Sequence, residues 1–307
     1  MVIYKLPQCH IVEALPKNCA LALGNFDGVH KGHQKLFEFA GEGGCKNVAW
    51  TFTSLAKPGV TVPFLTDMKA KLELFSIYGL DYAVFEDFEA VRSMEYGEFA
   101  TKYLIDNFAP KRVVCGFNFR FGRGGAGDAE KLRSLLAPLG VEVGIIQPVL
   151  YHGKTVSSSA VRAAVELGDM EEASMLLGHH FSVNTPVVEG KHLGRTWGFP
   201  TINQEFSEGC IVPRRGIYAT TAYIDGEKYI SVSNVGVRPT VDKEGSRVNC
   251  ETHIIGYEGE LYGREIKVDF HLYLRDEMRF SSAEELTAQI KNDIESAKAF
   301  FDDSFVG

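Results

Sequence analysis

Two histidines in the segment Gly24-Asn25-Phe26-Asp27-Gly28-Val29-His30-Lys31-Gly32-His33 have the spacing and surroundings of a phosphate site. The apolar run 19–23 precedes them and the periodic run 34–40 follows, which predicts a strand, a tight turn and a helix. A helix start offers unpaired N–H groups and the positive end of its dipole, where phosphate binds. Glycines let a polyphosphate approach the backbone, and imidazoles stabilise charge around an attacked phosphorus. We therefore predict phosphate chemistry; a metal site is the minor alternative, with Asp27 either supporting the turn or holding Mg²⁺.

Two other polar segments follow predicted strands or begin predicted helices. Asn118, in the run Gly116–Gly122, offers a donor and an acceptor just after an apolar strand. Ser158 lies among three hydroxyls at a helix start, where N-capping is the plainer interpretation. Arg162 lies one turn further along, in reach of an anion held at that start, so we expect a triphosphate contact there.

A second strong motif spans residues 194–203, where glycines flank Thr201 and Asn203. In an extended chain these two side chains point to one face, and their hard oxygens suit Mg²⁺ shared with phosphates. A Gly/Pro turn without a ligand is the alternative. Glu251 and Arg275 end or interrupt strand-like runs and are ambiguous from local sequence alone.

The first half alternates strands with helices. Strands are predicted at 19–24, 47–53, 81–85, 112–116 and 141–146, and helices at 31–41, 67–78, 95–108 and 129–138. This alternation indicates an α/β domain with a Rossmann-like parallel sheet covered by helices on both faces. Ligands bind beyond the carboxyl ends of such strands, where the histidine motif falls.

A helical stretch at 160–177 leads into a second half of different character. Gly168 is expected to cap one helix and Asp169 to begin the next. Short β-branched and aromatic runs at 182–189, 216–224, 228–235, 248–256 and 265–274 predict a small antiparallel β-barrel, closed by one terminal helix. Asp225-Gly226 marks a hairpin. We place the domains at 1–180 and 181–307.

Composition excludes several classes of protein. The 307 residues carry a net charge of −8 and show no basic stripe, which argues against nucleic-acid binding. The six cysteines are far apart, so buried free thiols are expected rather than a zinc site. No apolar stretch approaches ~18 residues and no signal segment is visible, so we expect a cytoplasmic protein without membrane contact.

Taken together, the motifs resemble those of the bifunctional bacterial riboflavin kinase/FMN adenylyltransferase family, also called FAD synthetase. The resemblance covers almost the whole chain. Besides the segments above it includes Asn234-Val235-Gly236-Val237-Arg238-Pro239-Thr240, Glu251-Thr252-His253, Leu261-Tyr262-Gly263 and Leu274-Arg275-Asp276-Glu277-Met278-Arg279-Phe280.

The resemblance implies two ATP-dependent reactions on small molecules: the second half phosphorylates riboflavin to FMN, and the first joins FMN to AMP, giving FAD and pyrophosphate. Glu251 would be the general base, with Thr201 and Asn203 holding Mg²⁺-ATP and Arg275 near the flavin. The catalytic histidines would be His30 and His33. The remaining nucleotide-binding positions would be Gly24, Phe26, Asp27, Gly32, Asn118, Ser158, Arg162, Gly190 and Gly194.

Two positions depart from the family pattern. Members usually carry F-D-P-H-P after the second strand, whereas Phe52 is followed here by Thr53-Ser54-Leu55-Ala56-Lys57-Pro58, and Thr185 replaces a glycine at the first barrel turn. The first departure leaves open a riboflavin kinase without adenylyltransferase activity. A flavin-sensing regulator without turnover is the alternative from another class.

Overall fold

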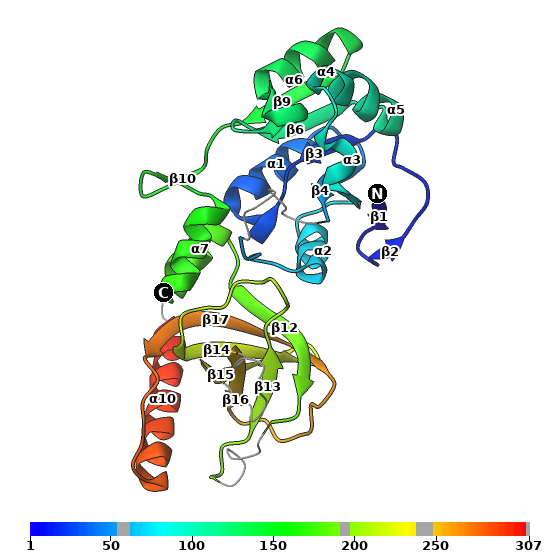
Figure 1. Cartoon of the computed structure of the whole chain (residues 1–307). Helices are drawn as coiled ribbons and strands as arrows, with labels where there is room; N and C mark the ends of the chain where they lie inside the picture. Colours follow the sequence, from blue (N-terminus) through cyan, green and yellow to red (C-terminus); the bar gives the residue numbers. More distant parts are fainter. Residues whose placement is uncertain (54–61, 191–196, 238–247, 305–307) are drawn as a thin grey trace. The chain divides into compact units, whose positions relative to one another are not determined.

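The computed structural model describes residues 1–53, 62–190, 197–237 and 248–304. The chain forms two compact units, Met1–Ser158 and Ser159–Gly307 (Figure 1). This division falls earlier in the chain than the domain boundary predicted after residue 180. The reason is that α7 (Ser158–Leu167), apart from its first residue, and α8 (Met170–Leu177) belong to the second unit, where α8 packs on the barrel strands β12 and β17.

The first unit is built on a seven-stranded sheet with the order β2-β1-β5-β4-β3-β6-β9. The five predicted strands are present and pair in parallel: β3 (Ala20–Leu23), β4 (Asn47–Phe52), β5 (Tyr82–Glu86), β6 (Arg112–Gly116) and β9 (Glu142–Ile146). Sequence patterns missed β1 (Val2–Lys5) and β2 (His10–Ile11), which form an antiparallel edge beyond β5. β2 has only two residues, and the four residues of β1 lack the continuous apolar run that marks β3.

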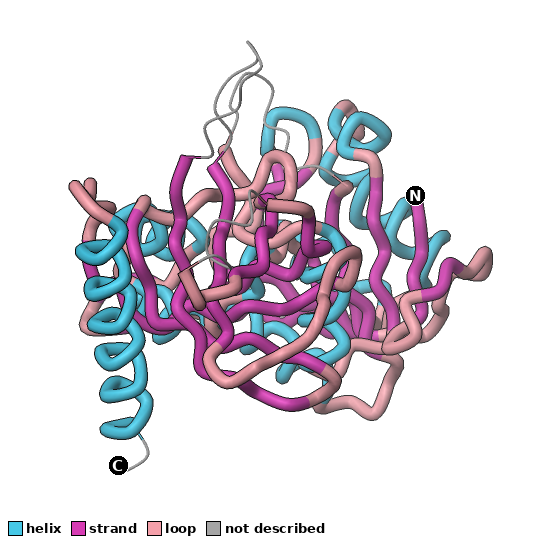
Figure 2. Tube along the Cα trace, turned by 90° about the horizontal axis from the view of Figure 1, so that it is seen from below, coloured by secondary structure: helices cyan, strands magenta, loops and turns pink. Residues whose placement is uncertain are grey.

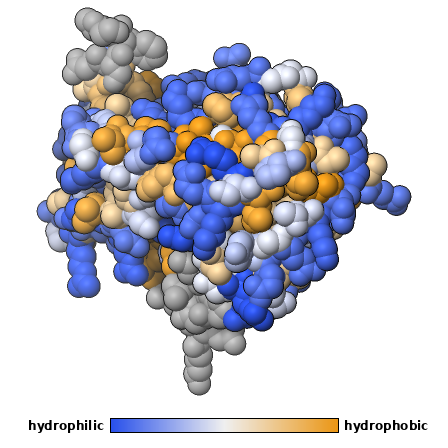
Figure 3. Space-filling view, turned by 90° about the horizontal axis from the view of Figure 1, so that it is seen from above, coloured by the Kyte–Doolittle hydropathy of each residue, from blue (hydrophilic) through white to orange (hydrophobic). Residues whose placement is uncertain are grey.

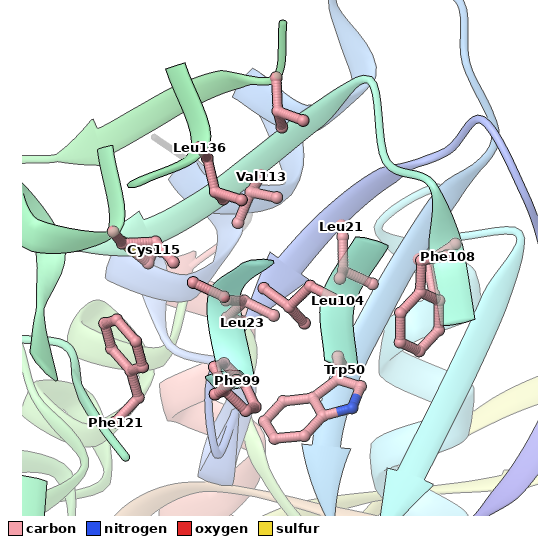
Figure 4. Close-up of a cluster of buried hydrophobic side chains, with 14 of the residues drawn as sticks. Leu21, Leu23, Trp50, Phe99, Leu104, Phe108, Val113, Cys115, Phe121 and Leu136 are labelled. Carbon is pink, nitrogen blue, oxygen red and sulfur yellow. The ribbon is translucent and has the colours of Figure 1, made fainter. Parts of the chain in front are cut away.

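Helices cover both faces of this sheet because side chains alternate along each strand. On one face lie α1 (Lys31–Gly41) and α2 (Met68–Ile77), whose apolar residues pack on Ala20, Ala22 and Ala49. On the other, a helical stretch over 96–108 and α6 (Ala129–Leu136) pack on Leu21, Leu23 and Trp50 (Figure 4). The predicted helix at 95–108 contains a π-helical turn at Phe99–Tyr103.

The second unit is a closed barrel of antiparallel strands with the order β12-β13-β16-β15-β14-β17. Its strands are β12 (Phe181–Val188), β13 (Thr201–Glu205), β14 (Gly216–Ile224), β15 (Glu227–Val237), β16 (Val248–Ile254) and β17 (Glu265–Arg275). The predicted hairpin joins β14 to β15 through Asp225 and Gly226, both with positive φ. The predicted capping pair also holds, since Gly168 has a φ of 80° and Asp169 accepts a hydrogen bond from the Glu172 N–H.

Helix α10 (Ala283–Ser304) lies along the outside of the barrel (Figure 2). Ser282 caps its start by accepting from the Glu285 N–H. The apolar side of this helix faces the strands, and Ile294 and Ala297 are buried in one cluster with Ile217 and Val232. Helix α10 therefore covers one outer face of the barrel, in addition to the strands β12 and β17 on which α8 packs.

The surface view in Figure 3 shows hydrophilic side chains interrupted by hydrophobic patches, in keeping with a mean hydropathy of −0.07. None of the helices in the described part of the chain combines the length and the apolar composition that crossing a membrane requires. Cys19, Cys115 and Cys250 are buried free thiols, as expected from their strand-like surroundings.

An ion pair joins α10 to the last barrel strand. The Arg275 guanidinium donates through Nε and Nη2 to the two carboxylate oxygens of Asp293, at 2.8 and 2.7 Å. The Asp293 side chain is only 6% exposed, and Gln289 also donates to it. Such a two-point, largely buried pair is costly to break because the remaining charge keeps no partner.

We expect Asp293→Ala to destabilise the docking of α10 by about 3 kcal/mol, since it leaves the Arg275 charge unpaired. Amide hydrogen exchange along α10 measures this as faster opening. Glu295→Ala is the matched control: it breaks the exposed pair with Lys298, which is worth less than about 1 kcal/mol. Equal exchange rates in the two variants would contradict the anchoring role of Asp293.

Candidate active sites

The turn after β3 has an unusual backbone. Phe26, Gly28 and Val29 have φ values of 51°, 77° and 42°, and Val29 is a β-branched residue in a region that such residues rarely adopt. Gln34 holds this turn by donating to the Val29 carbonyl at 2.8 Å. Strained turns of this kind occur where a site needs a fixed backbone shape. Here the turn delivers His30 to the N-cap of α1.

The two imidazoles stack on each other over the helix start, with ring centroids 3.6 Å apart and planes 17° apart. The His33 backbone N–H donates to the His30 carbonyl at 2.7 Å and also lies 3.4 Å from His30 Nδ1, an arrangement that favours the ring proton of neutral His30 on Nε2. A Cβ on Gly32 would lie 3.0 Å from the His30 ring, so glycine leaves room for the stack. The predicted clustering of the histidines at a helix start is therefore present.

Burial keeps both rings uncharged. Desolvation lowers the pKa of His30 from 6.5 to about 4. The pKa of His33 is also lowered, first by burial and then by the neighbouring His30 and the Lys71 ammonium. At neutral pH the pair thus offers N–H donors rather than fixed positive charges. Such donors stabilise anionic oxygens strongly when water is excluded.

Phe26 packs against the His33 ring, and Gly24 lies against Phe26. The Phe26 ring is fully buried and contacts His33, Phe37 and Phe75. A Cβ on Gly24 would lie 2.9 Å from that ring. Nucleotide contact by either residue would therefore involve the backbone, and their assignment as nucleotide-binding residues stays a prediction.

Asp27 supports the turn, which is one of the two roles left open from sequence. Its carboxylate is buried and accepts from the backbone N–H groups of Leu65 and Thr66, at 2.9 and 3.4 Å. Lys71, which the sequence analysis did not single out, is also buried and donates to the Asn25 carbonyl at 3.0 Å. The sequence signal that could have identified Lys71 is its position on the buried, otherwise apolar face of α2.

Two distant segments reach the same edge of the sheet. The Ser158 hydroxyl, at the end of the first unit, donates to the Asp27 carbonyl at 2.9 Å and so lies beside the histidine turn. Asn118 follows β6, whose Cys115 pairs with Leu23 at the end of β3. It is exposed, and its Oδ1 lies close to Gly116. Arg162 lies in the second unit, so its expected phosphate contact stays a prediction.

The second candidate site lies on the outer wall of the barrel. Strand pairing sets Asn203 of β13 directly opposite Glu251 of β16, and Glu251 directly opposite Asn234 of β15. Opposite residues point to the same side of a sheet, so two amides flank one carboxylate. Thr201 shares this face with Asn203, as the alternation of the strand predicted.

The oxygens gathered here fit a magnesium–nucleotide complex. Asn249, missed by the sequence analysis, donates through Nδ2 to Asn203 Oδ1 at 3.1 Å and to Glu251 Oε1 at 3.4 Å. The buried Oδ1 of Asn234 receives no hydrogen bond from the described residues. Amide, hydroxyl and carboxylate oxygens are the donors that Mg²⁺ prefers.

Gly190 and Arg275 lie at the margins of this site. A Cβ on Gly190 would lie 2.4 Å from Asn203 Nδ2, so glycine lets the backbone pass directly over the amide. Arg275, expected near the flavin, pairs with Asp293 in this structure, and a flavin contact stays a prediction. Gly194 and the segment that replaces D-P-H-P beyond Thr53 lie outside the described residues.

The uncharged state of His30 can be measured directly. We expect an NMR titration of the ATP-free protein to give the His30 ring a midpoint near pH 4 rather than 6.5. Because folding lowers this pKa, the neutral ring contributes stability above pH 6.5 that is lost as the pH falls toward 4. A His30 midpoint near pH 6.5 would contradict the desolvated pair.

Comparison with family models assigns each half of the chain. A model described as FAD synthetase matches residues 12–160, and one described as riboflavin kinase matches residues 177–301. A solved structure described as a macrolide-efflux protein from Streptococcus pneumoniae has a TM-score of 0.83 and 28% identity. It covers 92% of this chain, and 94% of that chain is matched, so the two share their fold over most of their length.

Curated relatives match over nearly the full length. A bifunctional riboflavin kinase/FMN adenylyltransferase from Escherichia coli (strain K12) is 34% identical over 302 residues, covering 95% of this chain and 96% of the relative. Its counterpart from Bacillus subtilis (strain 168) is 30% identical, covering 95% of each chain. With both catalytic modules matched in order, the chain belongs to the family of bifunctional riboflavin kinase/FMN adenylyltransferases.

Proposed function

We propose that this protein makes flavin nucleotides in two steps, with riboflavin kinase activity in the barrel and FMN adenylyltransferase activity in the α/β unit. One observation carries the proposal: each unit gathers its own set of polar groups suited to a nucleotide phosphate. The α/β unit has the stacked histidines at a helix start. The barrel has Asn203 and Glu251 opposite each other on its outer wall.

In the kinase step, the Glu251 carboxylate accepts the proton of a ribityl hydroxyl while that oxygen attacks the γ-phosphorus of ATP, and ADP leaves. Thr201 and Asn203 would hold Mg²⁺, which neutralises phosphate charge when bound. Gly190 lets the backbone lie against this site. Arg275 would contact the flavin either after its guanidinium leaves Asp293 or while it still pairs with that carboxylate.

In the adenylyltransferase step, an FMN phosphate oxygen attacks the α-phosphorus of ATP and pyrophosphate leaves. The attacking oxygen is already anionic, so this step needs no general base. His30 and His33 would donate N–H groups to the oxygens that gain charge. Ser158, Asn118 and Arg162 would orient the triphosphate, and much of the rate would come from holding the reacting atoms in line.

The deciding experiment supplies riboflavin and Mg²⁺-ATP to the purified protein and follows FMN and FAD by chromatography. The proposal expects FMN first and FAD second. FMN without FAD would indicate a kinase that has lost adenylyltransferase activity, consistent with the departure after Phe52. Flavin binding without either product would indicate a flavin-sensing regulator.

His30→Ala tests the adenylyltransferase half. Removing one preorganised donor should reduce FAD formation from FMN by about 10²- to 10³-fold and leave FMN formation from riboflavin unchanged. Rates of the two steps are measured separately, on added FMN and on riboflavin. His10→Ala, on exposed β2 of the same unit, is the matched control. A matched loss of both activities would refute the assignment of one site to each unit.

Glu251→Gln tests the kinase half. The amide cannot accept the hydroxyl proton, so FMN formation should fall about 10²- to 10⁴-fold while FAD formation from FMN persists. Glu227→Gln, exposed on β15 of the same barrel, is the control. Normal FMN production in Glu251→Gln would remove Glu251 from the mechanism.

A further inference from the structure

Asn249 occupies a position in the barrel wall from which one amide reaches two functional groups. It precedes Glu251 by two residues on β16, so both side chains point to the same side. Its Nδ2 lies 3.1 Å from Asn203 Oδ1 and 3.4 Å from Glu251 Oε1. An amide nitrogen carries two hydrogens, so it can serve both acceptors at once.

The orientation of the Asn203 amide follows from this contact. With its Oδ1 turned to Asn249, its Nδ2 faces the backbone of Gly190, where a Cβ would collide with it at 2.4 Å. The Asn203 amide is therefore held from two sides. One lone pair of Oδ1 accepts from Asn249, and the second stays available to a cation.

The two hydrogen bonds that Asn249 donates, to Asn203 and to Glu251, form a bridge whose effect on the site depends on burial. Asn203 and Asn249 are 6% and 5% exposed, so water does not readily replace either partner. Without the bridge, the Asn203 amide could turn by 180° and present nitrogen where oxygen is needed, and the Glu251 carboxylate could rotate away. A polar group that orients a ligand residue from behind typically changes metal affinity or activity 10- to 100-fold, as an order of magnitude.

We propose that Asn249 is a positioning residue of the kinase site: it locks the Asn203 oxygen and the Glu251 carboxylate into one shared orientation. This inference rests on the proposed kinase function. Asn249 itself needs no contact with substrate, because its amide hydrogens are engaged by the two groups that it orients.

The test replaces Asn249 by alanine in the full chain. We expect kcat/KM for riboflavin phosphorylation to fall about 10- to 100-fold and the Mg²⁺ concentration for half-maximal rate to rise. FAD formation from added FMN, which depends on the other unit, should be unchanged. Asn184→Ala on β12 is the control, because it removes a barrel asparagine from a different strand.

A binding measurement separates positioning from simple loss of stability. The side-chain amide NMR signal of Asn203, identified by its loss in Asn203→Asp, should shift when Mg²⁺ is added with saturating ADP. In Asn249→Ala that shift should require about tenfold more Mg²⁺. The signal reports on the barrel alone, so nucleotide bound to the α/β unit does not interfere.

The outcomes are distinct. Unchanged kcat/KM and an unchanged Mg²⁺ requirement would overturn the role of Asn249. So would a lower melting temperature with normal Mg²⁺ dependence, which would indicate packing alone. If Asn249→Ala does not fold, Asn249→Ser, which cannot reach both partners, gives the same comparison. A wild-type chain that binds Mg²⁺-ADP at Asn203 yet forms no FMN would defeat the proposed kinase function instead.

Discussion

Backbone pairing between strands is the constraint on which both sites depend. In the α/β unit, the parallel register of β3 and β6 brings Leu23 level with Cys115, so the histidine turn and Asn118 emerge at one edge. In the barrel, the register of β13, β16 and β15 sets Asn203, Glu251 and Asn234 in a single row. Because side chains alternate, a slip of one residue would send any of these groups to the opposite face.

The two sites handle charge in different ways. The α/β unit buries its imidazoles until they are neutral, with the pKa of His30 lowered to about 4. Anionic oxygens would then meet N–H donors and a helix dipole rather than mobile cations. The barrel instead keeps a carboxylate beside neutral amides, an arrangement suited to a proton acceptor next to a cation. Each arrangement suits the nucleophile proposed for it. The proposed nucleophile is an anionic phosphate in the α/β unit and a neutral hydroxyl in the barrel.

Supporting groups in both units are buried and hydrogen-bonded to backbone or to one another. Asp27 fastens the histidine turn to residues 65 and 66, and Lys71 fastens it to α2. Asn249 joins the Asn203 amide to the Glu251 carboxylate, and Asp293 holds Arg275 against α10. The groups that would touch substrate are thus few, and a larger set fixes where they point.

Hydrophobic periodicity and glycine-spaced motifs determined the parallel sheet, the barrel class, the hairpin at Asp225-Gly226 and the caps at Gly168 and Asp169, because these depend on local patterns. The two-residue spacing of Thr201 and Asn203 likewise determined their common face. Tertiary structure decided the role of Asp27, the neutral state of the histidines, the pairing of Arg275 with Asp293 and the bridge made by Asn249. These depend on which distant strand lies alongside and on how much water is excluded, and neither is encoded in the spacing of residues along one segment.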